Sequence, residues 1–175
     1  MIRLIIIVLV FINIVSFAQE QIATIIKSPS AFPVNDTRTK IFLGGSIDMG
    51  KSENWQAELE KELSKYNVII LNPRRDDWNK EWKPVSTDPN FQEQVEWELS
   101  ALEYADIIVM YFAPNSQSPI SLLELGLYAK TGKLLVICPE GFWCKGNVDI
   151  VCERYNIKTF TTFDEMIAEI KNQVD

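Results

Sequence analysis

Short apolar runs alternate with longer segments of helical character along this chain, and this alternation constrains the fold more than any other feature. The apolar runs have the length of buried strands and lie at 40–46, 68–71, 106–112, 133–138 and 157–160. The helical segments lie at 52–64, 91–104, 118–130, 148–154 and 164–174. A further run at 22–26 is a candidate edge strand. The pattern predicts an α/β fold: one doubly wound, flavodoxin- or Rossmann-like sheet of about five parallel strands, with helices on both faces.

Residues 1–19 have the pattern of a secretory signal peptide or an uncleaved membrane anchor. Arg3 supplies a short positive start, residues 4–15 are almost wholly apolar, and small residues at 16–18 suit a signal peptidase. Export or anchoring is therefore the favoured localisation, and the alternative is a cytoplasmic protein whose start has been placed too far upstream. Residues 20–175 suit one α/β domain with a substantial core.

Composition removes several classes of chemistry. The chain has no histidine, which excludes Ser-His-Asp and Cys-His catalysis and any histidine-ligated metal. Cys138, Cys144 and Cys152 are odd in number and contain no C-x-x-C pair, so neither a zinc site nor a full disulfide framework is indicated. No metal and no cofactor are expected. The net charge of -7 argues against nucleic acid as a partner. Acid–base work must therefore fall to Asp, Glu, Lys, Tyr or Cys.

Glu124 is the first candidate catalytic residue. It lies in a helical segment in which Ser118 can cap the free amides and Pro119 suits the first turn. At ~100° per residue, Glu124 falls within an apolar stripe, whose members are Ile120, Leu123 and Leu127. The other positions are also mostly apolar, which predicts burial on more than one side. A carboxyl there should have a raised pKa; it is either a reactive group or a structural one held by backbone amides.

The segment 91–104 places a second carboxylate on an inward face. Phe91, Val95 and Leu102 form its apolar stripe, and Glu98 lies on that stripe. Glu93, Glu96 and Glu103 point elsewhere. Two inward acids on two helices are a way for a site without histidine to hold a nucleophile and a proton donor.

Polar and glycine-rich loops follow the predicted strands. Because ligands of parallel α/β sheets bind beyond the carboxyl ends of the strands, these loops define a candidate binding edge. Trp78 beside Arg and Asp groups could stack on a nucleobase, or the loop could be a solvated segment pinned by its tryptophans. The candidate substrate-binding residues are Gly44, Gly45, Ser46, Asp48, Asn72, Arg74, Asp76, Asp77, Trp78, Asn115 and Ser118.

Four stretches together resemble the nucleoside 2-deoxyribosyltransferase-like proteins, a superfamily that includes deoxynucleoside-monophosphate N-glycosidases. The stretches are 42–47 (Phe-Leu-Gly-Gly-Ser-Ile), 71–78 (Leu-Asn-Pro-Arg-Arg-Asp-Asp-Trp), 94–98 (Gln-Val-Glu-Trp-Glu) and 118–126 (Ser-Pro-Ile-Ser-Leu-Leu-Glu-Leu-Gly). The resemblance covers roughly residues 22–160, and its more specific parts are the Leu-Glu-Leu-Gly helix and the Asn-Pro-Arg-Arg-Asp loop.

The resemblance implies roles for individual residues. Glu124 would be the nucleophile that attacks the anomeric carbon, and Glu98 takes the position of an acidic residue that helps the base to leave. Ser118 stands where the well-studied transferases carry an aspartate that contacts the sugar, so that contact is altered. The Gly-Gly-Ser turn is similar to one in the N-glycosidases whose serine assists phosphate binding. A homo-oligomer that completes the pocket across subunits is also implied by the resemblance.

Two functions follow as hypotheses. The first is cleavage or base exchange at the N-glycosidic bond of a (2-deoxy)nucleoside or nucleotide, a small-molecule substrate, through the Glu124 nucleophile. The second is a non-catalytic nucleoside- or nucleotide-binding or sensing module on the same fold. Retention of two inward acids favours the first, because an unsatisfied buried carboxylate costs roughly 1–3 kcal/mol. Phosphoryl transfer is disfavoured because no complete phosphate loop is present.

Overall fold

The computed structural model describes residues 22–47 and 52–174. The signal-like segment 1–19 and the candidate residue Asp48 lie outside these ranges. In the part described, no helix is long and apolar enough to cross a membrane. The strands are β1 (Thr24–Lys27), β2 (Thr39–Gly45), β3 (Val68–Asn72), β4 (Ile107–Tyr111), β5 (Leu134–Ile137) and β6 (Lys158–Phe160). The helices are α1 (Trp55–Leu63), α2 (Pro89–Tyr104), α3 (Pro119–Tyr128), α4 (Lys145–Tyr155) and α5 (Phe163–Val174).

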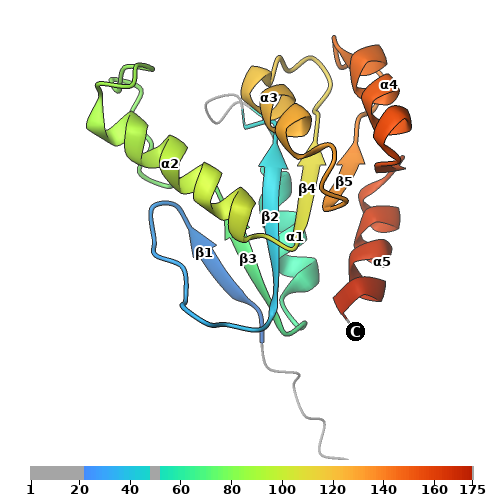
Figure 1. The fold of residues 1–175 in the computed structure, drawn as a ribbon, viewed down its shortest axis with the longest axis horizontal. Helices are drawn as coiled ribbons and strands as arrows, with labels where there is room; N and C mark the ends of the chain where they lie inside the picture. The colour runs from blue at the N-terminus through green and yellow to red at the C-terminus, as the bar shows by residue number, and fades with distance from the viewer. Residues whose placement is uncertain (1–21, 48–51, 175) are drawn as a thin grey trace, which may run out of the picture.

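The six strands form one parallel sheet in the order β1-β3-β2-β4-β5-β6 (Figure 1). Without β1, this is the flavodoxin-like order, in which the second strand lies on one side of the first and the third on the other. The predicted α/β class is confirmed, with six strands in place of about five. The predicted edge strand is also confirmed, since β1 pairs only with β3 among the described strands.

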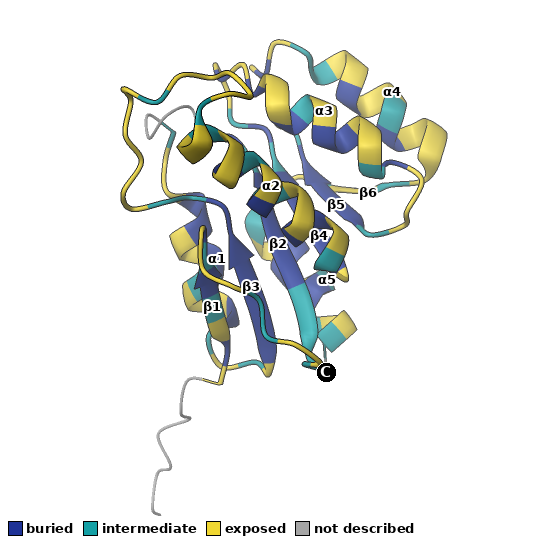
Figure 2. Cartoon of the chain, turned by 60° about the vertical axis from the view of Figure 1, so that its left-hand side comes forward, coloured by how far each residue is buried: buried dark blue, intermediate teal, exposed yellow. Residues whose placement is uncertain are grey.

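Alternating side chains of the strands build a core on each face of the sheet. On β2, Phe42 belongs to one core, whereas Ile41 and Leu43 belong to the other. The first core is covered by α2, α3 and α4, through Trp97, Ala101, Leu102, Leu125, Val148 and Cys152. The second is covered by α1 and α5, through Trp55, Leu59, Leu63, Met166, Ile167 and Ile170. Figure 2 shows the buried strands beneath α2, α3 and α4, whose outer faces are exposed.

One prediction about α3 is wrong. The stripe that should have been buried is exposed, with 57% of Ile120, 60% of Leu123 and 58% of Leu127 accessible. The helix instead turns Ser121, Glu124 and Leu125 inward. Because nearly every position of this helix is apolar, periodicity alone could not select the face that packs on the sheet. Glu124 is nevertheless buried, with 7% of the residue exposed.

The helix α2 agrees better with its predicted pattern. Leu102 is buried, and Phe91, Val95 and Glu98 are half-buried. The three acids expected to point outward, Glu93, Glu96 and Glu103, are exposed. The helix begins earlier than predicted because the Asp88 side chain accepts hydrogen bonds from the amides of Asn90 and Phe91 and so caps it.

Candidate active site

The candidate site lies at the carboxyl edge of the sheet, where β2 and β4 are neighbours. After β2 the chain continues to β3 on one side of this pair, and after β4 it continues to β5 on the other side. The boundary between β2 and β4 is therefore the topological switch point, where open α/β sheets bind ligands. Gly45 ends β2 opposite Tyr111 of β4. Its φ of +127° and the 2.3 Å between an added Cβ and the Tyr111 carbonyl oxygen leave room for glycine only. Gly44 precedes it and is buried in the strand.

A cluster of three buried serines joins the end of β2 to the start of α3. The Ser46 hydroxyl lies 2.8 Å from that of Ser116 and 2.6 Å from that of Ser118, and it accepts a hydrogen bond from the amide of Ala113. Trp55 donates its indole N–H to the Ser46 carbonyl. Ser46 and Ser118 are therefore brought together as predicted, and their hydroxyls hold the switch point in one arrangement.

The Ser118 side chain does not cap α3, contrary to the sequence-based expectation. Ser118 occupies the cap position with φ of 42°, in the left-handed region, and its side chain makes no capping hydrogen bond. The hydroxyl bonds to Ser46 and Ser116 instead. Asn115 also has a positive φ and is exposed, and its backbone N–H donates a hydrogen bond to the Gly141 carbonyl. Pro119 begins the helix as predicted.

The Glu124 carboxyl is buried, yet it forms no hydrogen bond with any residue of the described ranges. Burial, together with the nearby charge of Glu98, raises the pKa of Glu124 to about 8. A buried acid without donors around it is poorly stabilised in its charged form. It is not a structural carboxylate held by backbone amides, which was the alternative interpretation of the sequence.

Glu98 is held in place by Gln94, one turn earlier on α2. The side-chain Nε2 of Gln94 donates hydrogen bonds to the Glu98 carboxyl, at 2.8 Å, and to the Pro73 carbonyl, at 2.9 Å. The side-chain oxygen of Gln94 accepts a hydrogen bond from the Ser28 hydroxyl. Burial raises the pKa of Glu98 to about 6, and the hydrogen bond from Gln94 opposes this rise. The sequence prediction did not include Gln94, although its position four residues before Glu98 placed both on one helix face.

Glu98 also lines a cavity of about 320 Å³ together with residues of the loop after β3. The other lining residues are Ile47, Pro73, Arg74, Arg75, Trp78 and Gln94. Glu124 is not among them, but the effect of Glu98 on its pKa shows that the two carboxyls are close enough to interact. Glu98 and the loop after β3 thus line one cavity, and Glu124 lies within electrostatic range of Glu98.

Trp78 belongs to this cavity, whereas three polar residues of the same loop have partners elsewhere. Trp78 is 39% exposed and contacts Trp82 edge to face, with ring centroids 5.2 Å apart. The side-chain amide of Asn72 donates a hydrogen bond to the Glu60 carboxyl, and its side-chain oxygen accepts one from the backbone N–H of Arg74. Asp76 pairs with Lys27, and Asp77 pairs with Arg75. None of these three lines the cavity, and each has a structural partner.

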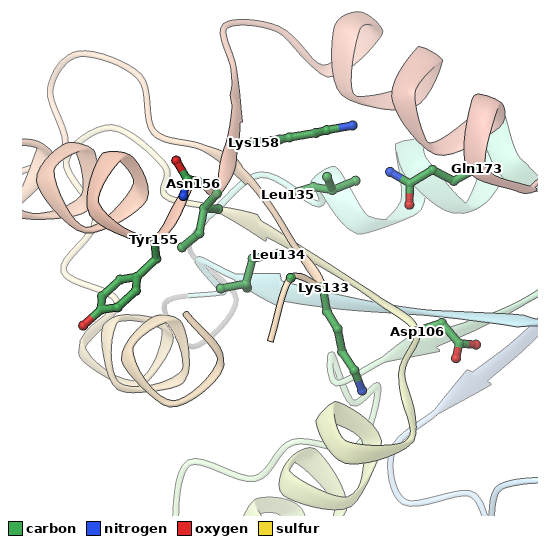
Figure 3. A pocket seen from close by; sticks show the side chains of 10 residues that line it. Asp106, Lys133, Leu134, Leu135, Tyr155, Asn156, Lys158 and Gln173 are labelled. Carbon is green, nitrogen blue, oxygen red and sulfur yellow. The ribbon is translucent and has the colours of Figure 1, made fainter. Parts of the chain in front are cut away.

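A second cavity, of about 180 Å³, opens at the opposite, amino edge of the sheet. Figure 3 shows that Lys133 extends from it toward α2 and Lys158 toward α5. Lys133 donates to the carbonyls of Glu103 and Ala105, and Lys158 pairs with Glu169. Lys158 is thus neutralised by an acid, whereas Lys133 is bound by carbonyls at the end of α2. This cavity lies at the end of the strands where α/β proteins do not place their sites.

The described ranges contain no candidate metal site, and burial makes two of the three cysteines poor nucleophiles. These ranges contain no group of three His, Cys, Asp or Glu residues that could hold a metal ion. The three cysteines are free thiols, and burial raises the pKa of Cys138 and of Cys152 to about 11. Thiols with such pKa values stay protonated and are weak nucleophiles at neutral pH. The acid pair remains as the reactive feature.

Fold and site define an α/β protein of flavodoxin-like strand order with two interacting acids at its switch point. The model of the family described as nucleoside 2-deoxyribosyltransferase like matches residues 38–142, more than half of the chain. The chain belongs to this family. A solved structure, described as a conserved protein from Enterococcus faecalis V583, is similar over 78% of this chain and 99% of its own, with a TM-score of 0.58 and 13% sequence identity. At that identity the likeness shows the fold alone. Comparison with curated proteins found no match.

Proposed function

We propose that this protein cleaves the N-glycosidic bond of a (2-deoxy)nucleoside or nucleotide, or exchanges its base, with Glu124 as the nucleophile. The observation that carries the proposal is a pair of inward carboxyls with raised pKa values at the switch point, the half-buried Glu98 and the buried Glu124. Paired acids in a desolvated setting are the usual equipment for glycosidic chemistry. The family points to the same kind of substrate.

The chemistry balances with the groups present. In the first step, the ionised Glu124 carboxylate forms a bond to the anomeric carbon while the bond from that carbon to the base nitrogen breaks. The base nitrogen keeps the electron pair and receives a proton from Glu98. In the second step, water or another base attacks the anomeric carbon, the Glu124 carboxylate leaves, and the released proton returns to Glu98.

The pair needs one proton between its two members for this reaction. With two ionised acids there is no donor, and with two protonated acids there is no nucleophile. The pKa values of about 6 for Glu98 and about 8 for Glu124 favour a singly protonated pair at neutral pH. In the free protein Glu124 holds that proton more tightly, so the proton must pass to Glu98 or to the base when substrate binds.

The alternative is a non-catalytic nucleoside- or nucleotide-binding module on the same fold. Its support is Ser118, which stands where the transferases carry a sugar-contacting aspartate. The Ser118 hydroxyl is bonded to Ser46 and Ser116 and cannot supply a charge. Such a module would bind a ligand without turning it over.

The test uses the full chain incubated with each 2′-deoxynucleoside and each 5′-monophosphate, with and without a second free base. Chromatography follows base release or exchange. We expect turnover that falls at least ~10³-fold in Glu124→Gln, because the amide cannot attack carbon. The matched control is Lys158→Gln at the amino edge, which should keep wild-type turnover. Turnover unchanged in Glu124→Gln would refute the nucleophile, and binding without turnover would establish the alternative.

We further propose that a second copy of the chain covers the exposed stripe Ile120, Leu123 and Leu127. The stripe is uncharged, so it is a surface through which two chains of net charge -7 could meet without repulsion. Glu124 lies four residues after Ile120 and three before Leu127, so it borders the stripe on the helix. A partner seated there would therefore adjoin the candidate site and help to exclude water from it.

Sedimentation velocity tests this assembly. We expect a wild-type oligomer that Leu123→Glu converts to monomer, because a charge would be buried at the contact. Val34→Glu is the matched control, since Val34 is exposed in the connector between β1 and β2 and should leave the oligomer intact. A wild-type protein that sediments as a monomer at all concentrations would refute the proposal.

A further inference from the structure

Two adjacent arginines line the candidate cavity, but their charges are balanced differently. Arg75 pairs with both Asp77 and Glu93, and its guanidinium lies 4.8 Å from the centre of the Trp82 ring. Arg74 forms no ion pair with any acid of the described ranges. Its hydrogen bonds go to the carbonyls of Ser52 and Glu53 and to the side-chain oxygen of Gln56. One cation of the cavity wall is therefore neutralised and the other is not.

Within the described ranges, the Arg74 guanidinium has more N–H donors than it has acceptors. Nη1 donates to Glu53 and Gln56 at 3.4 and 3.3 Å, and Nη2 donates to Ser52 at 3.3 Å. A guanidinium has five N–H donors, so the Nε donor and one Nη2 donor remain. Nε and Nη2 form the side edge of a guanidinium, which can bind two oxygens of one anion.

The same edge is occupied in two other arginines of this chain. Arg38 uses Nε and Nη2 to hold both oxygens of Asp36. Arg75 uses Nε and Nη2 to hold both oxygens of Asp77. Arg38 and Arg75 thus bind carboxylates through the Nε–Nη2 edge, whereas the Nε of Arg74 has no acceptor in the described ranges.

The fold holds Arg74 in position at a cost. Gln56 is fully buried, and its side-chain oxygen accepts from Arg74. Its Nε2 is a buried side-chain donor with no hydrogen-bond partner in the described ranges. An unsatisfied buried donor costs roughly 1–3 kcal/mol. A residue that served the core alone would be apolar, so Gln56 is best explained by its bond to Arg74.

We propose that Arg74 binds an oxyanion of the substrate, a phosphate or a carboxylate, through its free Nε–Nη2 edge. This inference rests on the proposed function for the location of the substrate, because Arg74 and Glu98 line one cavity. It deepens that function by naming the substrate class. The substrate carries an anionic group, either a 5′-phosphate or a carboxylate on the base, and a neutral nucleoside is a poor ligand.

Binding is measured by titration calorimetry in the full-length Glu124→Gln variant, so that turnover does not interfere. The ligands are 2′-deoxynucleosides, their 5′-monophosphates and a 2′-deoxynucleoside whose base carries a carboxylate. We expect one anionic class to bind at least ~10-fold more tightly than the neutral nucleosides. Combining Arg74→Gln with Glu124→Gln should abolish that preference, because it weakens the anionic ligands at least ~10-fold more than the neutral ones. Adding Arg38→Gln, which removes an arginine outside the cavity, should preserve it.

Each outcome decides the proposal. Preference for the monophosphates assigns the anion to the sugar side, and preference for the carboxylated base assigns it to the base. Equal affinity for neutral and anionic ligands, no binding of either anion, or a preference that survives Arg74→Gln would overturn it. If Arg74→Gln does not fold, Arg74→Lys takes its place and should retain only part of the preference, because an ammonium lacks the fork.

The proposed function can fail separately from this inference. An Arg74-dependent preference in a protein that releases no base would support the oxyanion site and refute the glycosidic chemistry. Base release from neutral nucleosides as fast as from anionic ones would do the reverse.

Discussion

Both edges of the sheet carry polar groups near a cavity, but the fold uses these groups differently at each edge. At the amino edge, Lys133 binds the carbonyls at the end of α2 and Lys158 pairs with Glu169. At the carboxyl edge, Glu124 has no hydrogen bond, and Arg74 has no carboxylate partner, in the described ranges. Glu124 and Arg74, which lack an ion-pair partner in the described ranges, therefore both belong to the carboxyl edge.

The two cavities therefore differ in chemistry as well as in size, which is about 320 Å³ at the carboxyl edge and about 180 Å³ at the amino edge. A buried polar group without a partner is costly, and a fold keeps it where a ligand will complete it. The cations of the amino edge, Lys133 and Lys158, instead bind groups of helices α2 and α5. Predictions that remove polar groups should therefore affect activity at the carboxyl edge and stability at the amino edge.

The largest expected effect beyond the loss of the nucleophile is on the pH dependence of catalysis. We expect a bell-shaped profile of kcat/KM with limbs near pH 6 and pH 8, the pKa values of Glu98 and Glu124. Below the lower limb both acids are protonated, and above the upper limb both are ionised. The rate should fall about tenfold per pH unit beyond each limb, which steady-state kinetics across the range will measure.

Glu98→Gln sharpens this test because it removes one member of the pair. The rate should fall, and the profile should keep one limb, the ionisation of Glu124. That limb should move to lower pH, since the Glu98 charge that helps to raise the Glu124 pKa is gone. A two-limbed profile in Glu98→Gln would show that the second acid is a different residue.

The sequence predicted the fold well because its strands and helices are short, regular and clearly separated. It also predicted that Glu98 and Glu124 face inward, since each lies where a charged side chain interrupts an apolar pattern. It could not select the buried face of α3, because Leu122, Leu125 and Ala129 compete with Ile120, Leu123 and Leu127 for that role.

Two further features depend on contacts between distant segments and so were beyond the sequence. The Ser118 hydroxyl bonds to Ser46, 72 residues away, in preference to the helix that it begins. The anchoring of Glu98 requires Gln94 to bridge α2, Pro73 and Ser28. Among the loop residues, pattern could not separate Arg74, with its free edge, from Asp76 and Asp77, which have partners.

The smallest expected effects are on stability, and they have opposite signs at the two edges. The folded-state pKa of Glu124 is raised from 4.5 to about 8, so ionising it destabilises the folded state as pH rises through that interval. Glu124→Gln should therefore match wild type near pH 5 and exceed its free energy of unfolding by ~1 kcal/mol or more near pH 9. Lys133→Met should lose ~1 kcal/mol at both pH values, because carbonyls at the end of α2 lose their donor. Urea unfolding of the three proteins at both pH values measures these differences. A Glu124→Gln variant that is less stable than wild type near pH 9 would mean that its carboxylate is satisfied by the fold, and the contrast between the two edges would then disappear.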